Sequence, residues 1–307
     1  MKVLLCGDFD DPERAAWLHV LRQALPEAQW LDLAQAREPD NASQVQAAVV
    51  ANPAPGSLQG LPNLRLIQSL WAGVDRLLAD ATLPAGVPVA RMVDPAMNAA
   101  MAQTALWAVL SLHRGYFAYA RQQQLKQWQV HPQRRADEVS VRVLGQGQIG
   151  QAVTQRLLQM GYAAQGFSRS AGKPLLPFLA GCQILINLLP LTKQTRSLLD
   201  ARCFAAMPRG ASVVNLARGA HLVEADLLAA LDSGQLQHAV LDVFQTEPLP
   251  SDHPFWTHPR VTVLPHAAAL TDERSAAVVV ARNLRLLAQP GSLKPAFLHL
   301  VDPSLGY

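Results

Sequence analysis

The chain has 307 residues, of which 50% are hydrophobic and 16% are charged, and its formal net charge is +3. This length allows two domains with a core each. Lysine and arginine form no block of five or six residues and no apolar run reaches about eighteen residues, so neither nucleic acid nor a membrane is indicated as a partner.

Short apolar runs alternate with helical patterns in the N-terminal third, which predicts a parallel sheet covered by helices. The expected strands are 3–6, 30–33, 47–50, 64–70 and 87–92, with a helix over about 13–25. The pattern from 98 to about 127 predicts one long helix that links this domain to a second. A last apolar helix over about 272–287 is expected to return to the first domain.

The run Val141–Leu144 leads into a glycine-rich turn, Gly145-Gln146-Gly147-Gln148-Ile149-Gly150, and a helical pattern follows. A strand, such a turn and a helix in this order are typical of dinucleotide binding. We expect Gly145 to allow the turn, Gly147 to admit the pyrophosphate and Gly150 to allow close packing. Gln148 and Ile149 then lie at a helix N-terminus, whose free N–H groups favour phosphates. A purely structural glycine turn is the alternative.

The next predicted strand, 163–167, ends in Ser168-Arg169-Ser170 and no carboxylate follows it closely. NAD sites usually place Asp or Glu there to bind the ribose 2′-hydroxyl. A guanidinium between two hydroxyls suits a 2′-phosphate instead. We therefore predict NADP(H), with Lys173 as a further cation, the alternative being an ordinary solvated arginine.

Further strands are expected at 184–188, 212–216, 239–243 and 261–264, with helices at 200–207 and 224–232 between them. Polar residues follow three of these strands, namely Arg218, Glu247 and His266. Because ligands bind beyond the carboxyl ends of parallel strands, the three could converge beside a cofactor. Taken singly, each has an ordinary alternative explanation: Arg218 could cap a helix, Glu247 could lie in a turn, and His266 could be a structural residue at an interface.

Three isolated cysteines form neither a zinc pattern nor a disulfide framework, so no metal site is predicted and a reducing, cytoplasmic location is expected. The fold class predicted is α/β with two doubly wound parallel-sheet domains. A Rossmann NADP-binding domain, 98–269, is expected to be inserted into a discontinuous flavodoxin-like substrate domain, 1–97 plus 270–307.

Over nearly its whole length the chain resembles the D-isomer-specific 2-hydroxyacid dehydrogenases, and within them the bacterial glyoxylate/hydroxypyruvate reductase A branch. The motifs that carry the resemblance, besides the glycine loop, are Trp71-Ala72-Gly73-Val74-Asp75, Asn187-Leu188-Leu189-Pro190-Leu191-Thr192, Asn215-Leu216-Ala217-Arg218-Gly219, Leu241-Asp242-Val243-Phe244, Glu247-Pro248 and Pro265-His266. Leu stands where many members have His in the second of these motifs, and Trp71 is bulky where a small residue is common.

The resemblance implies a role for each site residue. Arg218 would hold the carboxylate and carbonyl oxygens of a 2-oxo acid, His266 would donate the proton, and Glu247 would orient the histidine ring. Trp71 and the backbone amides of Ala72, Gly73 and Val74 would contact the substrate. Asp242 would orient the nicotinamide, and Leu189, Pro190 and Ala217 would border the cofactor.

The implied function is NADPH-dependent reduction of glyoxylate to glycolate and of hydroxypyruvate to glycerate, by a homodimer. One alternative keeps the mechanism but changes the substrate to a bulkier 2-oxo acid such as phenylpyruvate. Another is a non-catalytic NAD(P)-sensing regulatory protein. Oxidation of NADPH with a panel of 2-oxo acids separates the three.

Overall fold

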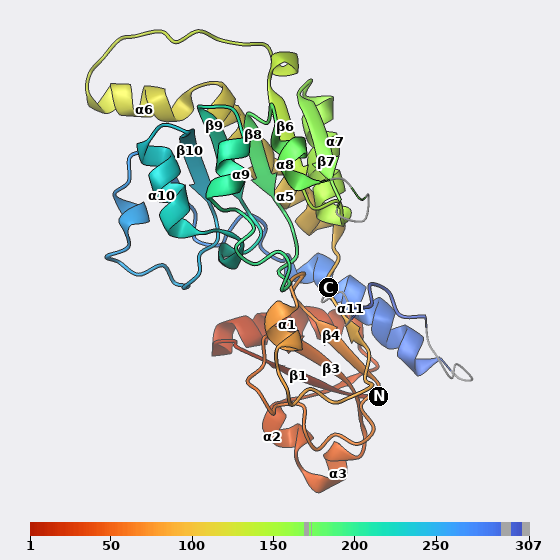
Figure 1. The fold of residues 1–307 in the computed structure, drawn as a ribbon. Coiled ribbons are helices and arrows are strands. Elements are labelled where there is room, and N and C mark those ends of the chain that lie inside the picture. The colour runs from red at the N-terminus through yellow and green to blue at the C-terminus, as the bar shows by residue number, and fades with distance from the viewer. Residues whose placement is uncertain (169–171, 173, 290–295, 303–307) are drawn as a thin grey trace. The chain divides into compact units, whose positions relative to one another are not determined.

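The computed structural model describes residues 1–168, 172, 174–289 and 296–302. The chain folds into two compact units (Figure 1): unit 1 comprises residues 1–96 and 271–307, and unit 2 comprises residues 97–270. Each unit is built around one parallel sheet with helices, which confirms the predicted α/β fold class.

Unit 1 has a five-stranded parallel sheet in the order β2-β1-β3-β4-β5, which is the flavodoxin-like order. Buried apolar side chains fill β1 and β3, as expected for strands covered on both faces. Asp10 and Asp272 cap α1 and α11, which pack against each other. The elements are β1 Lys2–Gly7, α1 Asp11–Ala24, β2 Gln29–Leu31, α2 Leu33–Ala36, α3 Pro39–Ala42, β3 Val45–Ala51, β4 Leu66–Ser69, α4 Asp75–Leu78, β5 Val89–Ala90 and α11 Glu273–Ala288.

Unit 2 has a six-stranded parallel sheet in the order β11-β10-β9-β8-β6-β7. After β6 the chain adds β7 on one side and then β8 on the other, so the switch point of this sheet lies at β6, where α/β proteins bind ligands. The elements are α5 Pro95–His113, which begins in unit 1, α6 Tyr116–Gln124, η1 Ala136–Glu138, β6 Ser140–Leu144, α7 Gln148–Gln159, β7 Ala163–Phe167, α8 Leu175–Leu179, β8 Ile184–Asn187, α9 Ala201–Ala206, β9 Ala211–Asn215, η3 Gly219–His221, α10 Glu224–Asp232, β10 Leu236–Leu241, η4 Pro254–Trp256 and β11 Val261–Val263.

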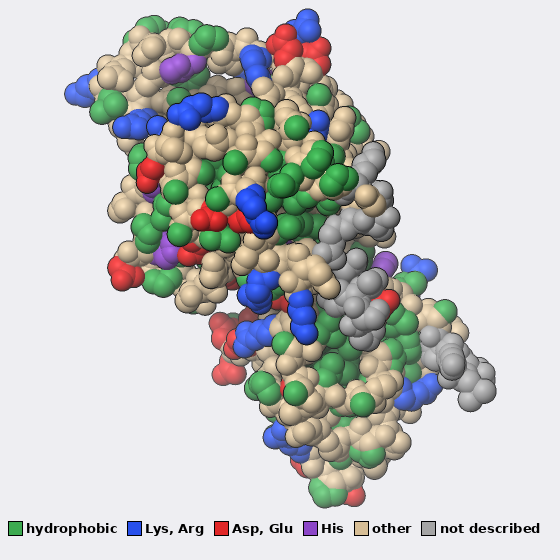
Figure 2. Space-filling view, viewed as in Figure 1, with side chains coloured by type: hydrophobic (Ala, Val, Ile, Leu, Met, Phe, Trp, Pro, Cys, Tyr) green, Lys and Arg blue, Asp and Glu red, His purple; other side chains and the backbone are tan. Residues whose placement is uncertain are grey.

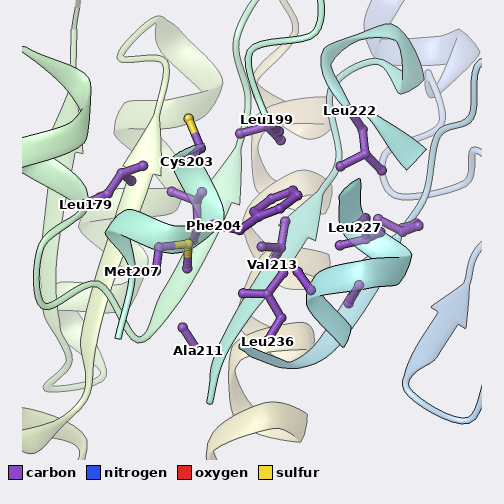
Figure 3. Packing of buried hydrophobic residues seen from close by; sticks show 14 of the residues in the cluster. Leu179, Leu199, Cys203, Phe204, Met207, Ala211, Val213, Leu222, Leu227 and Leu236 are labelled. Carbon is purple, nitrogen blue, oxygen red and sulfur yellow. The ribbon is translucent and has the colours of Figure 1, made fainter. Parts of the chain in front are cut away.

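Two apolar clusters cover the two faces of this sheet. Alternate strand residues point to opposite faces, so neighbours such as Val213 and Val214 belong to different clusters. One cluster includes side chains of α8, α9 and α10. Figure 3 shows Phe204 of α9 there among leucines of the surrounding segments. The other cluster includes α5 and α7, so the helix of the glycine loop and the helix that enters the unit share one face.

The predicted single helix from 98 to 127 is wrong. Two helices, α5 and α6, occupy the region, and Gly115 separates them with a φ of 72°. This left-handed conformation, which glycine adopts readily, cannot continue an α-helix. The strand expected to reach residue 33 ends at Leu31 because Asp32 caps α2, with Gln35 completing a capping box.

No helix in the described ranges is both long and apolar enough to cross a bilayer. Within the same ranges no group of three or more His, Cys, Asp or Glu side chains could hold a metal ion. On the face shown in Figure 2, Lys and Arg side chains occur over both units, with Asp and Glu side chains among them.

Candidate active site

The glycine loop has the geometry that a dinucleotide requires. Gly145 has a φ of 92°, and a Cβ there would lie 2.6 Å from the Leu188 carbonyl oxygen. A Cβ at Gly150 would collide with the Gly145 carbonyl. Gly147, by contrast, is exposed, and a Cβ there would meet no described atom within 4 Å. Side chains are thus excluded at Gly145 and Gly150, whereas the backbone of Gly147 is exposed at the start of α7.

Gln146, which the sequence prediction did not single out, stabilises this loop. Its Nε2 donates to the Gly145 carbonyl at 2.9 Å and approaches the Thr154 hydroxyl of α7 at 3.2 Å. The amide occupies space that a side chain at Gly166 would fill, because a Cβ there would collide with it. The sequence signal was the glycine at position 166 within β7, since a glycine inside a strand often marks a close approach.

The predicted 2′-phosphate segment follows β7 directly. Ser168 is partly buried there. Arg169, Ser170 and Lys173 lie outside the described residues.

The candidate catalytic residues of unit 2 follow three neighbouring strands. Arg218 comes three residues after β9, while Glu247 follows β10 and His266 follows β11. Because β9, β10 and β11 are adjacent and parallel, their carboxyl ends share one edge of the sheet. The positive charge of Arg218 is a minor influence on the pKa values of Glu247 and His266, smaller than the hydrogen bond between those two residues.

Arg218 lies in a tight turn between β9 and η3. Its Nη1 donates to the Ala217 carbonyl at 2.7 Å, and its own carbonyl accepts the Asn215 side-chain amide at 3.0 Å. Asn215 is fully buried and is the last residue of β9. The turn that carries the guanidinium is therefore fixed from inside the protein.

His266 and Glu247 form a hydrogen-bonded ion pair. The Nδ1 atom of His266 lies 2.7 Å from Oε2 of Glu247, and Oε1 of Glu247 accepts the Phe244 N–H at 2.8 Å. The His266 side chain is 52% exposed, and within the described ranges its Nε2 atom makes no hydrogen bond. The ring is thus held at one nitrogen, and the other is available to a ligand.

This pair shifts the pKa values of both groups. The hydrogen bond that His266 donates to the Glu247 carboxylate raises the pKa of His266 above its usual value, outweighing the opposite effect of burial. Burial would raise the pKa of Glu247, but the bonds to His266 and to the Phe244 N–H outweigh it and lower that pKa. The pair therefore favours a protonated imidazole beside an ionised carboxylate.

Asp242, predicted to orient the nicotinamide, holds the His266 loop. Its two carboxylate oxygens accept the Ala267 and Ala268 N–H groups at 2.8 and 3.1 Å, and its carbonyl accepts the His266 N–H at 2.8 Å. Burial raises the pKa of this carboxyl, although the two backbone N–H groups oppose the shift. His266 has a φ of 55°, in the left-handed region that non-glycine residues adopt uncommonly.

Leu189, Pro190 and Ala217, the predicted cofactor border, follow β8 and β9. Leu189 and Ala217 are 7% exposed each, whereas Pro190 is partly buried. A cavity of about 360 Å³, which the sequence prediction missed, adjoins the His266 loop. Its lining residues are Gln103, Thr104 and Trp107 of α5 and Leu264, Ala267 and Ala268.

The predicted substrate segment belongs to unit 1. Trp71 follows β4, its N–H donates to the Ser69 hydroxyl at 3.0 Å, and its ring packs edge-on against Trp17. Val74 is buried at the start of α4. In the described part of the chain, the N–H groups of Ala72 and Gly73 make no hydrogen bond, so both remain available as donors.

Comparison with known proteins identifies the family. The model of the D-isomer specific 2-hydroxyacid dehydrogenase NAD binding domain matches residues 106–268. The chain belongs to the D-isomer specific 2-hydroxyacid dehydrogenases. A glyoxylate/hydroxypyruvate reductase A of Serratia proteamaculans (strain 568) is 40% identical, and the match covers 100% of each chain. The predicted family and its reductase A branch are thereby confirmed.

Solved structures of dehydrogenases of this family have the same fold. One from Xanthobacter autotrophicus Py2, in complex with NADPH and MES, has a TM-score of 0.89 and 36% identity, with 100% of this chain and 99% of that one covered. An NADPH-dependent glyoxylate/hydroxypyruvate reductase from Sinorhizobium meliloti, in complex with NADP and sulfate, has a TM-score of 0.89, 33% identity and the same coverage.

Proposed function

We propose that the protein is an NADPH-dependent reductase of glyoxylate and hydroxypyruvate. The observation that carries this proposal is the hydrogen-bonded His266–Glu247 pair, which lies at the same edge of the sheet as Arg218. The relative of Serratia proteamaculans, matched along the entire chain, is named for the same activity.

The residues of unit 2 fit the cofactor. The open backbone at Gly147 and the N–H groups of Gln148 and Ile149 would receive the pyrophosphate at the start of α7. Leu189, Pro190 and Ala217 would border the cofactor, Asp242 would lie near its nicotinamide, and Ser168, Arg169 and Ser170 would hold the 2′-phosphate. When bound, NADPH supplies the hydride.

The chain's own residues supply the proton for the carbonyl oxygen and the positive charge that stabilises this oxygen. His266, protonated because Glu247 raises its pKa, donates a proton from Nε2 to the carbonyl oxygen of the 2-oxo acid. The fork of Arg218 can bind carboxylate and carbonyl oxygens together, stabilising the negative charge that develops on the latter. A binding role for Trp71, Ala72, Gly73 and Val74 toward the substrate carboxylate stays a prediction, supported by the available N–H groups of Ala72 and Gly73.

Steady-state oxidation of NADPH in the presence of glyoxylate, hydroxypyruvate and phenylpyruvate tests the proposal. We expect the highest kcat/KM with the two small acids. A preference for phenylpyruvate would favour the bulkier-substrate alternative. NADPH binding without turnover of any acid would favour a regulatory protein.

We further propose that two copies form a homodimer in the cytoplasm. After α6 the chain runs through a long connection to β6 (Figure 1), where Leu125, Trp128 and Val130 are 56%, 100% and 78% exposed. Such apolar exposure is typical of an interface. The three free, buried thiols fit a reducing compartment.

Sedimentation and light scattering of the wild type and of Trp128→Arg test the dimer. We expect a dimer that the variant weakens, whereas Trp256→Arg, at another exposed tryptophan, leaves it intact. A monomeric wild type would contradict this part of the proposal. Fractionation of cells tests the location.

A further inference from the structure

Three polar side chains are completely buried where β8 and β9 end. Asn187 is the last residue of β8, Asn215 is the last residue of β9, and His221 is the last residue of η3. Each has 0% exposure. Buried polar groups are stable only when they are hydrogen-bonded, so their partners define what this cluster does.

Backbone N–H groups fix the orientation of both asparagine amides. The Leu189 N–H donates to Oδ1 of Asn187, and the Ala217 N–H donates to Oδ1 of Asn215, each at 3.3 Å. Because an N–H must face an oxygen, both Nδ2 groups are the donors on the other side. Nδ2 of Asn187 then donates to Oδ1 of Asn215 at 2.9 Å.

The orientation of the Asn187 amide also assigns the tautomer of His221. Nδ2 of Asn187 lies 2.9 Å from Nδ1 of His221, so Nδ1 accepts and carries no proton. Nε2 lies 3.2 Å from the Pro190 carbonyl, so Nε2 carries the proton and donates it. An additional proton on Nδ1 would face the amide N–H of Asn187.

This cluster holds two segments of the candidate site. The Arg218 carbonyl accepts both Nδ2 of Asn215 at 3.0 Å and the His221 N–H at 3.3 Å. Gly219 lies directly against the Phe244 backbone, where a Cβ would collide. After His221, Leu222 enters the apolar cluster seen in Figure 3. The Arg218 turn is therefore fixed on one side by hydrogen bonds and on the other by packing.

We propose that His221, as the neutral Nε2–H tautomer between Asn187 and Pro190, is a positioning residue that ties the Arg218 turn to the Leu189-Pro190 segment. This inference rests on the proposed function, because its consequence is the correct placement of Arg218 for the 2-oxo acid. His221 itself acts through its neighbours and does not donate the proton of the reaction.

Kinetics of His221→Leu test the proposal. We expect kcat/KM for glyoxylate to fall roughly tenfold to a hundredfold, since a misplacement of about 1 Å can cost about a hundredfold. The dissociation constant of NADPH should rise by a smaller factor. His221→Gln keeps one acceptor and one donor, so it should recover part of the loss. His238→Leu removes another buried histidine of unit 2, bonded to Thr262, and should leave kcat/KM unchanged.

A double-mutant cycle with Arg218→Lys distinguishes positioning from general destabilisation. If His221 acts through the arginine fork, His221→Leu should reduce kcat/KM much less in the lysine background than in the wild type. Equal factors in both backgrounds would overturn the proposal. A wild-type kcat/KM in His221→Leu would overturn it as well.

Long-range ¹H–¹⁵N spectra of histidine-labelled protein report on the ring directly. We expect a neutral Nε2–H signature at neutral pH that is missing in His221→Gln. An Nδ1–H tautomer or an imidazolium would overturn the inference even if the variants fold poorly. These spectra and the NADPH dissociation constant need no turnover, so a wild type that reduces no 2-oxo acid would refute the proposed function separately.

Discussion

Oε2 of Glu247 lies 2.7 Å from Nδ1 of His266, and the same carboxylate accepts the Phe244 N–H through its other oxygen. The bond to the Phe244 N–H therefore fixes the orientation in which the carboxylate faces the histidine. This arrangement raises the pKa of His266, and the protonated form is the one required for reduction.

Glu247→Gln should move the alkaline limb of the reduction profile to lower pH. With its raised pKa, His266 stays protonated as the pH increases, and activity is lost as the pH passes through that pKa. A neutral amide removes the cause of the shift, so the proton is lost earlier. The measurement is kcat/KM for glyoxylate against pH. Glu224→Gln, which changes a carboxylate beside His253, is the matched control. If the alkaline limb of the profile stays at the same pH in Glu247→Gln, Glu247 does not raise the pKa of His266.

His266→Ala should leave NADPH binding intact and suppress reduction by a factor on the order of 10²–10⁴, the usual contribution of a general acid. Binding is measured by cofactor fluorescence and reduction by single-turnover kinetics. His19→Ala, at an exposed position of α1, is the control. Retention of most of the activity would assign the proton to another group.

Arg218→Lys should impair turnover more than cofactor binding. Lysine keeps the charge but loses the planar fork that can bind two oxygens at once. We expect a loss of roughly 3–4 kcal/mol in transition-state stabilisation, the size seen when an oxyanion donor is removed. The ratio of kcat/KM values gives this energy, with the exposed Arg196→Lys as control. Near-normal activity of Arg218→Lys would show that the arginine does not bind the substrate through two oxygens.

Asp242→Asn should lower both stability and kcat. Both carboxylate oxygens accept backbone N–H groups, so an amide must place its own NH₂ against one of them. A buried donor left without an acceptor costs about 1–3 kcal/mol. Loss of the bond to Ala267 or Ala268 should also let the backbone at His266 leave its left-handed conformation. Urea unfolding and kcat are the measurements, and the exposed Asp252→Asn should change neither.

The sequence could predict the parts of this protein that depend on local patterns. Gly145 and Gly150 exclude side chains as expected, and Arg218, Glu247 and His266 follow strands that the apolar runs located. The hydrogen bonds of Asn187 with His221 and of Asp242 with the His266 loop join residues 34 and about 25 positions apart, and no periodicity encodes such pairs. The sequence pattern does not reveal the helix break at Gly115, because apolar residues continue directly after this glycine.

The choice between NADPH and NADH should depend on Arg169, which lies outside the described residues. Arg169→Asp should weaken NADPH and let the enzyme tolerate NADH, because a 2′-phosphate carries close to two negative charges. A charge-assisted hydrogen bond contributes about 1.5–3 kcal/mol, which is about tenfold to a hundredfold in affinity. The new carboxylate would also repel the phosphate and could accept the ribose hydroxyls. The measurement is the ratio of kcat/KM for NADPH and NADH, with Arg156→Asp on the exposed side of α7 as a control of equal charge. A wild type that prefers NADH would contradict the interpretation of Ser168-Arg169-Ser170. If the ratio is unchanged in Arg169→Asp, Arg169 does not bind the phosphate, and Lys173 becomes the candidate.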